Sequence, residues 1–267
     1  SYVLPLLRHV LDQRPLKDNE GPIALIMVPT RELAVQIYQE LRMFTKYLML
    51  NVCCVYGGSA IGNQISELRR GCEIVVATPG RLIEILCLSN GKITNLLRVT
   101  FVVIDEADRM LDMGFEPQIS RIIANIRPSR QTVMFSATFP KQIEALAKKI
   151  LTKPLEIVVG QRGQSAKNIT QYIEVIPKSK SFVRLIEILD EYVNTSTIIF
   201  ADSQSESIEL WKQLYKQGFN CLLVHGGMDQ EDRIDAISQF KSEQSHILIS
   251  TSICARGLDV THCELVI

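Results

Sequence analysis

Two adjacent carboxylates, Asp105 and Glu106, are the residues of this sequence best suited to chemistry. They directly follow the apolar run Phe101–Ile104, which is typical of a buried strand. In an open α/β sheet, ligands bind at the carboxyl ends of the strands. Phosphoryl transfer needs one carboxylate to hold Mg²⁺ and a second group to orient or deprotonate water. We therefore predict that Asp105 holds Mg²⁺ through water and that Glu106 activates the attacking water. The alternative is that these acidic residues only cap the following helix.

Other predicted strands also end in residues that suit phosphate contacts. Thr30 and Arg31 follow one strand and open a helix, whose N-terminal NH groups can bind a phosphate. The TPGR segment at 78–81 follows another strand, and the SAT segment at 136–138 ends a third. Hydroxyls, backbone NH groups and arginines contact a sugar–phosphate backbone without reading bases. Each segment alone is more typical of a helix cap, but their joint occurrence favours a nucleic-acid path.

Apolar runs that predict strands alternate with amphipathic stretches that predict helices, such as Arg31–Lys46 and Lys141–Leu151. The predicted strands are Ile23–Val28, Val52–Val55, Ile74–Ala77, Phe101–Ile104, Thr132–Phe135, Leu155–Val159, Ile169–Val175, Thr197–Phe200, Cys221–Val224 and Ile247–Ser250. Most are continuous apolar runs, which are typical of parallel strands buried on both faces. The sequence therefore predicts an α/β fold with parallel sheets.

The second half of the sequence repeats the organisation of the first. Asn51–Gly58 aligns with Asn220–Gly227, and Glu73–Thr78 aligns with His246–Thr251, in the same order and at nearly the same offset. Ordered matches of this kind indicate two domains of one fold in tandem. The intervening Gly- and Gln-rich segment is typical of a linker.

We therefore expect a first domain at 1–159, a linker at 160–168 and a second domain at 169–267. Within the repeat, Phe101–Ile104 aligns with Glu264–Ile267. The first domain continues for several elements beyond its copy of this strand, so we expect the second domain to lack their equivalents.

Composition argues against several classes of protein. Lys plus Arg and Asp plus Glu number 29 each, so the net charge is zero and binding of nucleic acid by bulk positive charge is not expected. The seven cysteines form no CxxC pair and there are four histidines, which argues against a zinc site or a disulfide framework. Free thiols indicate a reducing compartment. The sequence has no signal peptide and no apolar run long enough to span a bilayer, so we expect neither secretion nor a membrane partner.

Taken in order, the segments PTRELA, GG, TPGR, DEAD, SAT, HGGMDQEDR and STSICARGLDV resemble the motif set of DEAD-box ATP-dependent RNA helicases. The resemblance covers nearly the whole sequence. It implies two RecA-like domains, with ATP and Mg²⁺ bound in the cleft between them and single-stranded RNA contacted through its backbone along both. Members of this family couple ATP hydrolysis to local separation of short RNA duplexes or to remodelling of ribonucleoprotein.

The resemblance also implies roles for individual residues in catalysis. Asp105 and Glu106 match the pair that holds Mg²⁺ and activates water. Asp108 matches the residue that connects this motif to Ser136 and Thr138, and so couples hydrolysis to RNA binding.

Further positions match residues that contact the ligands. Gly257 and Asp259 match residues that face the nucleotide, while the role of Arg256 in the same segment stays open. The RNA contacts that the resemblance implies are Thr30, Arg31, Gly58, Thr78, Gly80, Arg81, Gly226, Gln230, Arg233 and Thr251. From the residues alone, Arg233 is better explained as a solvated charge on a helix.

A finer resemblance is to the Prp-five-type splicing helicases. It rests on HVLDQRP at 9–15, VYGG at 55–58, GFEPQI at 114–119 and RPSRQTVMFS at 127–136. Those helicases act on the snRNP that recognises the branch site. The resemblance therefore implies a nuclear location, with a cytoplasmic one as the alternative, and spliceosomal snRNP proteins as partners. We expect a monomer.

The sequence departs from the family pattern in two places. It contains no GxxxxGK[ST] phosphate loop, which the family has just before the helix predicted at Tyr2–Leu11, and no adenine-reading Gln segment. It also lacks the HRxGRxGR segment that carries the arginine finger. We therefore expect a partial core with both domains incomplete, and predict that these 267 residues alone do not hydrolyse ATP at a useful rate.

Two other classes of function stay open. A non-catalytic RecA-like clamp or scaffold on RNA would account for the absent phosphate loop, but such a protein has no need of both Asp105 and Glu106. A DNA helicase of related fold is disfavoured because the DEAD, PTRELA and ARGLD segments all favour RNA.

Overall fold

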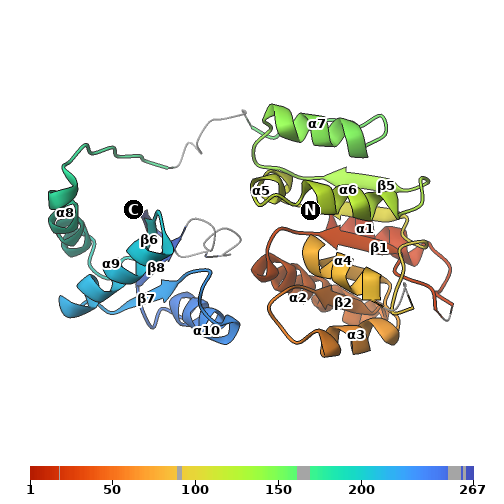
Figure 1. Ribbon diagram of the computed structural model, residues 1–267, viewed down its shortest axis with the longest axis horizontal. Helices are drawn as coiled ribbons and strands as arrows, with labels where there is room; N and C mark the ends of the chain where they lie inside the picture. The colour runs from red at the N-terminus through yellow and green to blue at the C-terminus, as the bar shows by residue number, and fades with distance from the viewer. Residues whose placement is uncertain (18, 89–91, 161–168, 252–259, 261–262) are drawn as a thin grey trace. The chain divides into compact units, whose positions relative to one another are not determined.

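The chain folds as two compact units, Ser1–Gln164 and Ser165–Ile267. Each unit contains one parallel sheet with helices packed on it (Figure 1), which confirms the predicted α/β fold with two parallel sheets. The computed structural model describes residues 1–17, 19–88, 92–160, 169–251, 260 and 263–267.

A five-stranded parallel sheet forms the centre of the first unit. Its strands are β1 (Ala24–Met27), β2 (Val52–Val55), β3 (Ile74–Ala77), β4 (Phe101–Ile104) and β5 (Gln131–Met134). They are arranged in the order β2-β3-β1-β4-β5, and every neighbouring pair is parallel. Strands β1, β3 and β4 are buried at every residue, because helices cover both faces of the sheet.

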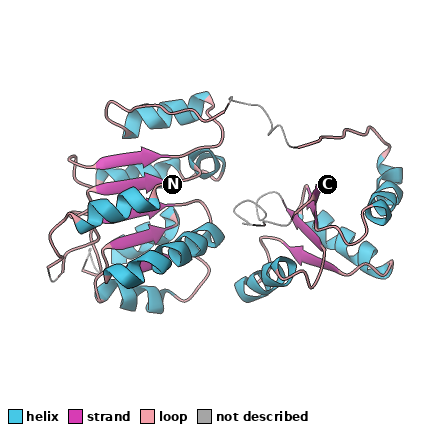
Figure 2. Ribbon diagram, turned by 180° about the vertical axis from the view of Figure 1, so that it is seen from behind, coloured by secondary structure: helices cyan, strands magenta, loops and turns pink. Residues whose placement is uncertain are grey.

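Helices form a layer on each face of this sheet (Figure 2). They are α1 (Val3–Leu11), α2 (Arg31–Leu48), α3 (Ile61–Arg69), α4 (Pro79–Cys87), α5 (Ala107–Asp112), α6 (Glu116–Ala124) and α7 (Lys141–Ile150). Helices α1 and α2 pack on one face, where Leu6 and Leu41 are fully buried, and the others pack on the opposite face. Burying each such leucine contributes about 1.5–3 kcal/mol to folding. The predicted helices at Arg31–Lys46 and Lys141–Leu151 end within two residues of α2 and α7.

The second unit repeats the strand order of the first. Its strands are β6 (Thr197–Ala201), β7 (Cys221–Val224), β8 (Ile247–Thr251) and β9 (Leu265–Val266), and its helices are α8 (Lys178–Glu191), α9 (Gln204–Lys216) and α10 (Gln230–Lys241). The parallel order β7-β8-β6-β9 matches β2-β3-β1-β4 strand for strand. The predicted internal repeat is therefore confirmed. Within the described part of the chain, no helix has the length and apolar character to cross a membrane.

Two of the predicted strands are wrong. Leu155–Val159 and Ile169–Val175 form neither strand nor helix. Their apolar side chains are exposed, at 86% for Leu155 and 90% for Ile173. A strand is stabilised by backbone pairing and by side chains on neighbouring strands, and neither segment pairs with a strand among the described residues. Composition alone therefore predicts strands at both segments, but no pairing with a described strand stabilises them.

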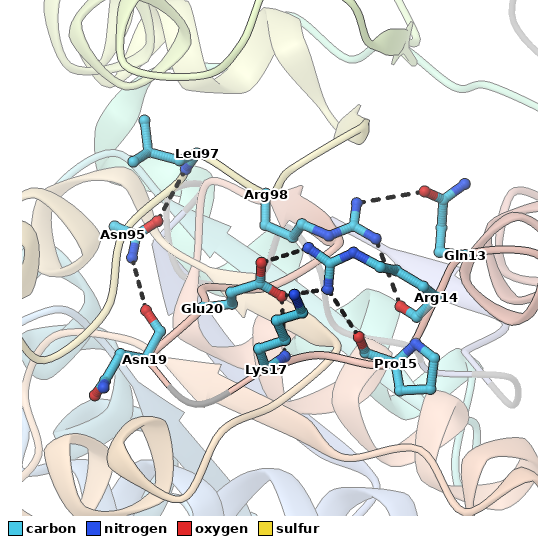
Figure 3. Close-up of polar contacts among 9 residues, drawn as sticks. All are labelled: Gln13, Arg14, Pro15, Lys17, Asn19, Glu20, Asn95, Leu97 and Arg98. Atoms are coloured by element: carbon cyan, nitrogen blue, oxygen red, sulfur yellow. Dashed lines mark hydrogen bonds and ion pairs between the residues drawn. The ribbon is translucent and has the colours of Figure 1, made fainter.

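Polar contacts tie the connection after α1 to the segment before β4 (Figure 3). The Arg14 guanidinium donates to both carboxylate oxygens of Glu20, and the Lys17 N–H donates to one of them. These hydrogen bonds, that of Arg14 first, lower the pKa of Glu20 to about 2. Arg98 donates to the side chain of Gln13 and to the carbonyl of Arg14. Both segments precede strands, so this cluster lies at the amino ends of the parallel strands.

Gly21 lies in the same connection, at a point where a side chain has no space. A Cβ at Gly21 would lie 1.7 Å from the carbonyl oxygen of Asn95. We expect Gly21→Ala to lower the free energy of unfolding by about 1–3 kcal/mol, because the backbone must move to relieve this overlap. Urea unfolding of the chain measures the difference.

Gly62→Ala provides a matched control. Nothing lies within 4 Å of a Cβ at Gly62, which is inside α3, so Ala is favoured there by up to about 1 kcal/mol. Equal stability of Gly21→Ala and the unchanged chain would contradict this account of the contact.

Candidate functional site

The predicted site residues of the first unit gather at one edge of its sheet. The register pairs Met27 with Ala77 and with Ile104, Val55 with Ala77, and Ile104 with Met134, so all five strands end level. The residues after these ends therefore share the carboxyl edge, where open α/β sheets bind ligands. They are Thr30, Arg31, Gly58, Thr78, Gly80, Arg81, Asp105, Glu106, Asp108, Ser136 and Thr138.

The Asp105 carboxylate accepts one hydrogen bond on each oxygen. The Glu106 N–H donates to Oδ1 at 2.9 Å, and the Tyr2 hydroxyl donates to Oδ2 at 2.8 Å. The Asp105 N–H continues the strand ladder by donating to the carbonyl of Met27 at 3.0 Å. Asp105 remains partly exposed, so it can still accept hydrogen bonds from a ligand or from water.

Tyr2 is a site residue that the sequence reasoning missed. It lies 103 positions from Asp105 in the sequence, and no local pattern points from one to the other. Burial first, and then the charge of Asp105, raises the pKa of the Tyr2 hydroxyl well above its ordinary value. The hydroxyl is therefore protonated at neutral pH and acts as a donor. Its ring packs on Phe135, with centroids 5.2 Å apart.

Glu106 has an unusual backbone conformation. It forms the N-cap of α5 with φ 51° and ψ 51°, which is the left-handed region. For a residue other than glycine this conformation costs about 1–2 kcal/mol. Its carboxylate lies 3.7 Å from the guanidinium of Arg109, whose side chain is 5% exposed. Backbone strain of this kind concentrates at functional sites, which supports the functional interpretation of the acidic segment over a helix cap alone.

Asp108 connects the end of β4 to the end of β5. Its Oδ2 accepts from the backbone N–H of Thr138 at 2.9 Å and from the Thr138 hydroxyl at 2.8 Å. The Ser136 hydroxyl accepts from the Asp108 N–H at 3.3 Å and donates to the Thr138 carbonyl at 2.7 Å. Burial raises the pKa of Asp108, but the hydrogen bonds from Thr138, Arg109 and Ser136 outweigh it, and the pKa lies below its ordinary value.

The predicted RNA contacts Arg31, Gly58 and Arg81 meet at one loop, residues 56–59, between β2 and α3. Gly58 has φ 81°, and a Cβ there would lie 2.1 Å from Arg31 Nη1, so the guanidinium of Arg31 lies directly against this glycine. Both terminal nitrogens of Arg81 donate to the carbonyl of Ser59 at 3.2 Å. Two cationic groups therefore flank a loop that needs glycine both for its conformation and for its packing.

Gln64 is a second residue that the sequence reasoning missed. It is 7% exposed on α3, where its amide accepts from the Tyr56 N–H at 3.2 Å and donates to the Tyr56 carbonyl at 3.0 Å. The same amide donates to the Ser59 hydroxyl at 2.7 Å. One buried side chain thus fixes both ends of the 56–59 loop. The available signal was a glutamine on the apolar face of a helix, between Ile61 and Leu68.

The other predicted contacts of this unit lie at helix starts. Thr30 caps α2 by accepting from the Leu33 N–H at 3.4 Å, so the expected cap role is present. Thr78 precedes α4 without a side-chain cap hydrogen bond and is 8% exposed. Gly80 is exposed, with open space around the position of a Cβ.

In the second unit, Gly226 follows β7 and Thr251 is the last residue of β8. Both therefore lie at the carboxyl edge of the second sheet. Gln230 begins α10. Arg233 is 5% exposed, so its interpretation as a solvated helix charge is wrong. Burial and then the charge of Arg233 lower the pKa of the neighbouring His225. Gly257, Asp259 and Arg256 lie outside the residues that the structure describes.

Comparison with known proteins identifies the class. The model of the DEAD/DEAH box helicase family matches residues 1–146, and the helicase conserved C-terminal domain matches residues 177–267. The chain belongs to the DEAD/DEAH box helicase family.

Individual relatives are consistent with this assignment. The chain is 56% identical over its full length to DEAD-box ATP-dependent RNA helicase 42 of Oryza sativa, of which it covers 26%. It is 52% identical, again over its full length, to the pre-mRNA-processing ATP-dependent RNA helicase prp5 of Emericella nidulans, of which it covers 23%. The predicted similarity to Prp-five-type helicases is confirmed. The chain spans about a quarter of the length of these curated relatives.

A solved structure shares the fold. S. cerevisiae Dbp5 bound to RNA and ADP BeF3 is 25% identical, with a TM-score of 0.85, and the match covers 99% of this chain and 65% of that chain. This likeness confirms the tandem RecA-like architecture.

We expect Asp108→Asn to destabilise the chain at pH 7 by about 1 kcal/mol, since hydrogen bonds to a charged group are worth about 1.5–3 kcal/mol and Asp108 is partly screened by solvent. Because the pKa of Asp108 is lowered in the folded state, the carboxylate's contribution to the free energy of unfolding is fully present above its unfolded-state pKa of about 4. It is lost as the pH falls through the folded-state pKa. Urea unfolding at pH 7 and at pH 3 should therefore give a smaller difference at pH 3.

Asp190→Asn serves as the control, because Asp190 is an exposed carboxylate on α8. This variant should match the unchanged chain at both pH values. An Asp108→Asn effect that is as small as that of Asp190→Asn at pH 7 would show that the β4–β5 connection contributes nothing to stability.

Proposed function

We propose that the protein containing this chain is an ATP-dependent RNA helicase, in which ATP hydrolysis is coupled to local separation of RNA duplexes. One observation carries the proposal. The Asp105–Glu106 pair, the Asp108–Thr138 connection and the two arginines at the 56–59 loop share one edge of one sheet. Carboxylates suited to hydrolysis and groups suited to a phosphate backbone thus follow the ends of strands in one parallel sheet.

The residues at this edge fit ATP with Mg²⁺. Asp105 supplies a partly exposed carboxylate, and Mg²⁺ is usually bound through one or two carboxylates, water and substrate phosphates. Bound Mg²⁺ would neutralise charge on the phosphates. Asp105 would hold it through water, and Glu106 would orient and deprotonate the attacking water. The αL turn at Glu106 lets two successive carboxylates serve these two roles from one strand end.

RNA would be contacted through its backbone. Arg31 and the loop at Gly58 offer a guanidinium and exposed backbone, and the start of α4 at Gly80 offers backbone approach without a side chain in the way. Such contacts position a strand without reading bases, which suits an enzyme that acts on many duplexes. The zero net charge of the chain agrees with a local path rather than a basic surface.

We further propose a nuclear role in pre-mRNA splicing, with snRNP proteins as partners. The relative from Emericella nidulans is named a pre-mRNA-processing helicase and shares 52% identity with the chain. The HVLDQRP and RPSRQTVMFS segments of this chain support the same branch.

A second candidate is a non-catalytic RNA clamp. The sequence in hand carries no GxxxxGK[ST] segment and no HRxGRxGR segment, which favours this alternative for the 267 residues taken alone. The intact Asp105 and Glu106, with Glu106 held in a strained turn, favour an enzyme.

We expect the 267-residue chain to release no phosphate from ATP above background. Loss of the arginine finger alone reduces the rate by roughly 10³–10⁵ in related enzymes. A form of the protein extended to the length of its relatives should show RNA-stimulated hydrolysis. Glu106→Gln in that form should lower the rate by at least about 10²-fold, because it removes the general base. Phosphate release with and without single-stranded RNA measures the rate for the 267-residue chain, for the extended form and for its Glu106→Gln variant.

The possible outcomes separate the candidates. Robust turnover by the 267-residue chain that Glu106→Gln abolishes would refute the prediction for the chain alone. RNA binding without turnover in the extended form would favour the clamp over the helicase.

We expect Arg31→Gln in the extended form to weaken binding of single-stranded RNA equally for different base sequences. Loss of one phosphate contact should reduce the slope of log affinity against log salt by about 0.7. Fluorescence anisotropy with a non-hydrolysable ATP analogue, over a range of salt concentrations, measures this slope.

Arg69→Gln is the matched control, because Arg69 is an exposed arginine at the end of α3. It should leave the slope unchanged. Equal slopes for Arg31→Gln and Arg69→Gln would remove Arg31 from the RNA path.

A further inference from the structure

Tyr2 and Asp105 form a contact that the proposed chemistry has not used. The Tyr2 hydroxyl donates to Asp105 Oδ2 at 2.8 Å, across 103 positions of sequence. Tyr2 is the N-cap residue of α1, which lies on the sheet face opposite to α5. The contact therefore reaches the carboxylate from the face of the sheet that carries none of the other predicted catalytic residues.

The ring of Tyr2 is held in place independently of its hydroxyl. It is half-buried and packs on Phe135 at the end of β5, with centroids 5.2 Å apart and an interplanar angle of 44°. Tyr2 also packs against the buried cluster on the α1 and α2 face of the sheet, so its side chain is restricted from more than one side. The hydroxyl thus approaches Asp105 from a fixed point, as a positioning group must.

Two donors on two different oxygens set the orientation of the Asp105 carboxylate. The Glu106 N–H occupies one site on Oδ1 and the Tyr2 hydroxyl one site on Oδ2. A carboxylate has about four acceptor sites, so each oxygen keeps one for a ligand. Without Tyr2, rotation about the Cβ–Cγ bond of Asp105 would be restrained on one side only.

The alternative is that the contact between Tyr2 and Asp105 has a purely structural role. A half-buried phenol needs a hydrogen-bond partner, and Asp105 supplies one. If that were the whole role, replacing Tyr2 by Phe would change stability slightly and leave the chemistry at Asp105 untouched. The two interpretations therefore differ in how the site responds to Mg²⁺.

We propose that Tyr2 is a positioning residue for Asp105, which fixes the carboxylate in the orientation that receives the hydrated Mg²⁺ of the nucleotide. The inference rests on the proposed function, because it assigns a task to Asp105. Groups that orient a metal-binding carboxylate typically change metal affinity by about 10–100-fold when removed. Since Asp105 acts through water, we expect a smaller effect here, a rise of about threefold to tenfold in the Mg²⁺ concentration required.

The test is Tyr2→Phe in the extended form of the protein, since this change keeps the ring and its packing on Phe135. Binding of a fluorescent ADP analogue is titrated with Mg²⁺, which needs no turnover, and the Mg²⁺ dependence of ATP hydrolysis is measured in parallel. We expect both midpoints to shift to higher Mg²⁺ by about threefold to tenfold, with the rate at saturating Mg²⁺ largely recovered.

Tyr47→Phe is the matched control, because Tyr47 lies on α2 and is 81% exposed. It should leave both midpoints unchanged. Unchanged midpoints in Tyr2→Phe would overturn the proposal, and so would a lower rate at every Mg²⁺ concentration with the same midpoints, since that pattern indicates a structural role.

The binding titration keeps this inference separate from the proposed function. An unchanged protein that binds the nucleotide with Mg²⁺ but does not hydrolyse ATP would refute the helicase activity, and the shift in Tyr2→Phe would still decide the role of Tyr2. Nucleotide binding that does not depend on Mg²⁺ at all would overturn the role of Tyr2 directly.

Discussion

Parallel pairing in level register is the constraint on which the candidate site depends. Because β2, β3, β1, β4 and β5 all run in one direction and end at matched residues, the segments that follow them are brought to a single edge. An antiparallel strand in this sheet would deliver its following residues to the opposite edge. The apolar strand residues that alternate between two helical layers fix this register, since a slip by one residue would exchange the faces of a whole strand.

The two edges of the sheet carry different tasks. At the amino edge, the Arg14–Glu20 pair lies in the connection after α1, and hydrogen bonds from Arg98 to Gln13 and Arg14 tie this connection to the segment before β4. At the carboxyl edge, Glu106 adopts a strained conformation and polar groups stay partly exposed. Strain and exposed carboxylates lower stability and are tolerated because the buried core beneath them is large.

Features that depend on local pattern were predictable, and features that depend on distant partners were not. Neighbouring residues predict the apolar strand before Asp105 and the helix that starts after Thr30. The internal repeat predicts that β9 is the equivalent of β4 in the second sheet. Leu155–Val159 has the composition of a strand but no described strand to pair with. The contact of Tyr2 with Asp105 depends on residues far apart in the sequence, which no periodicity reveals.

We propose that the Asp108–Thr138 connection, which joins the ends of β4 and β5, couples hydrolysis at Asp105 and Glu106 to RNA binding. The most direct measurement is the ratio of RNA-stimulated to basal ATP hydrolysis in Thr138→Val of the extended protein. This change removes the hydroxyl donor at 2.8 Å and keeps the backbone N–H donor. The account predicts that basal hydrolysis is retained while RNA stimulation falls by about tenfold or more, as expected for loss of one hydrogen bond to a charged group. Unchanged RNA stimulation in this variant would contradict it.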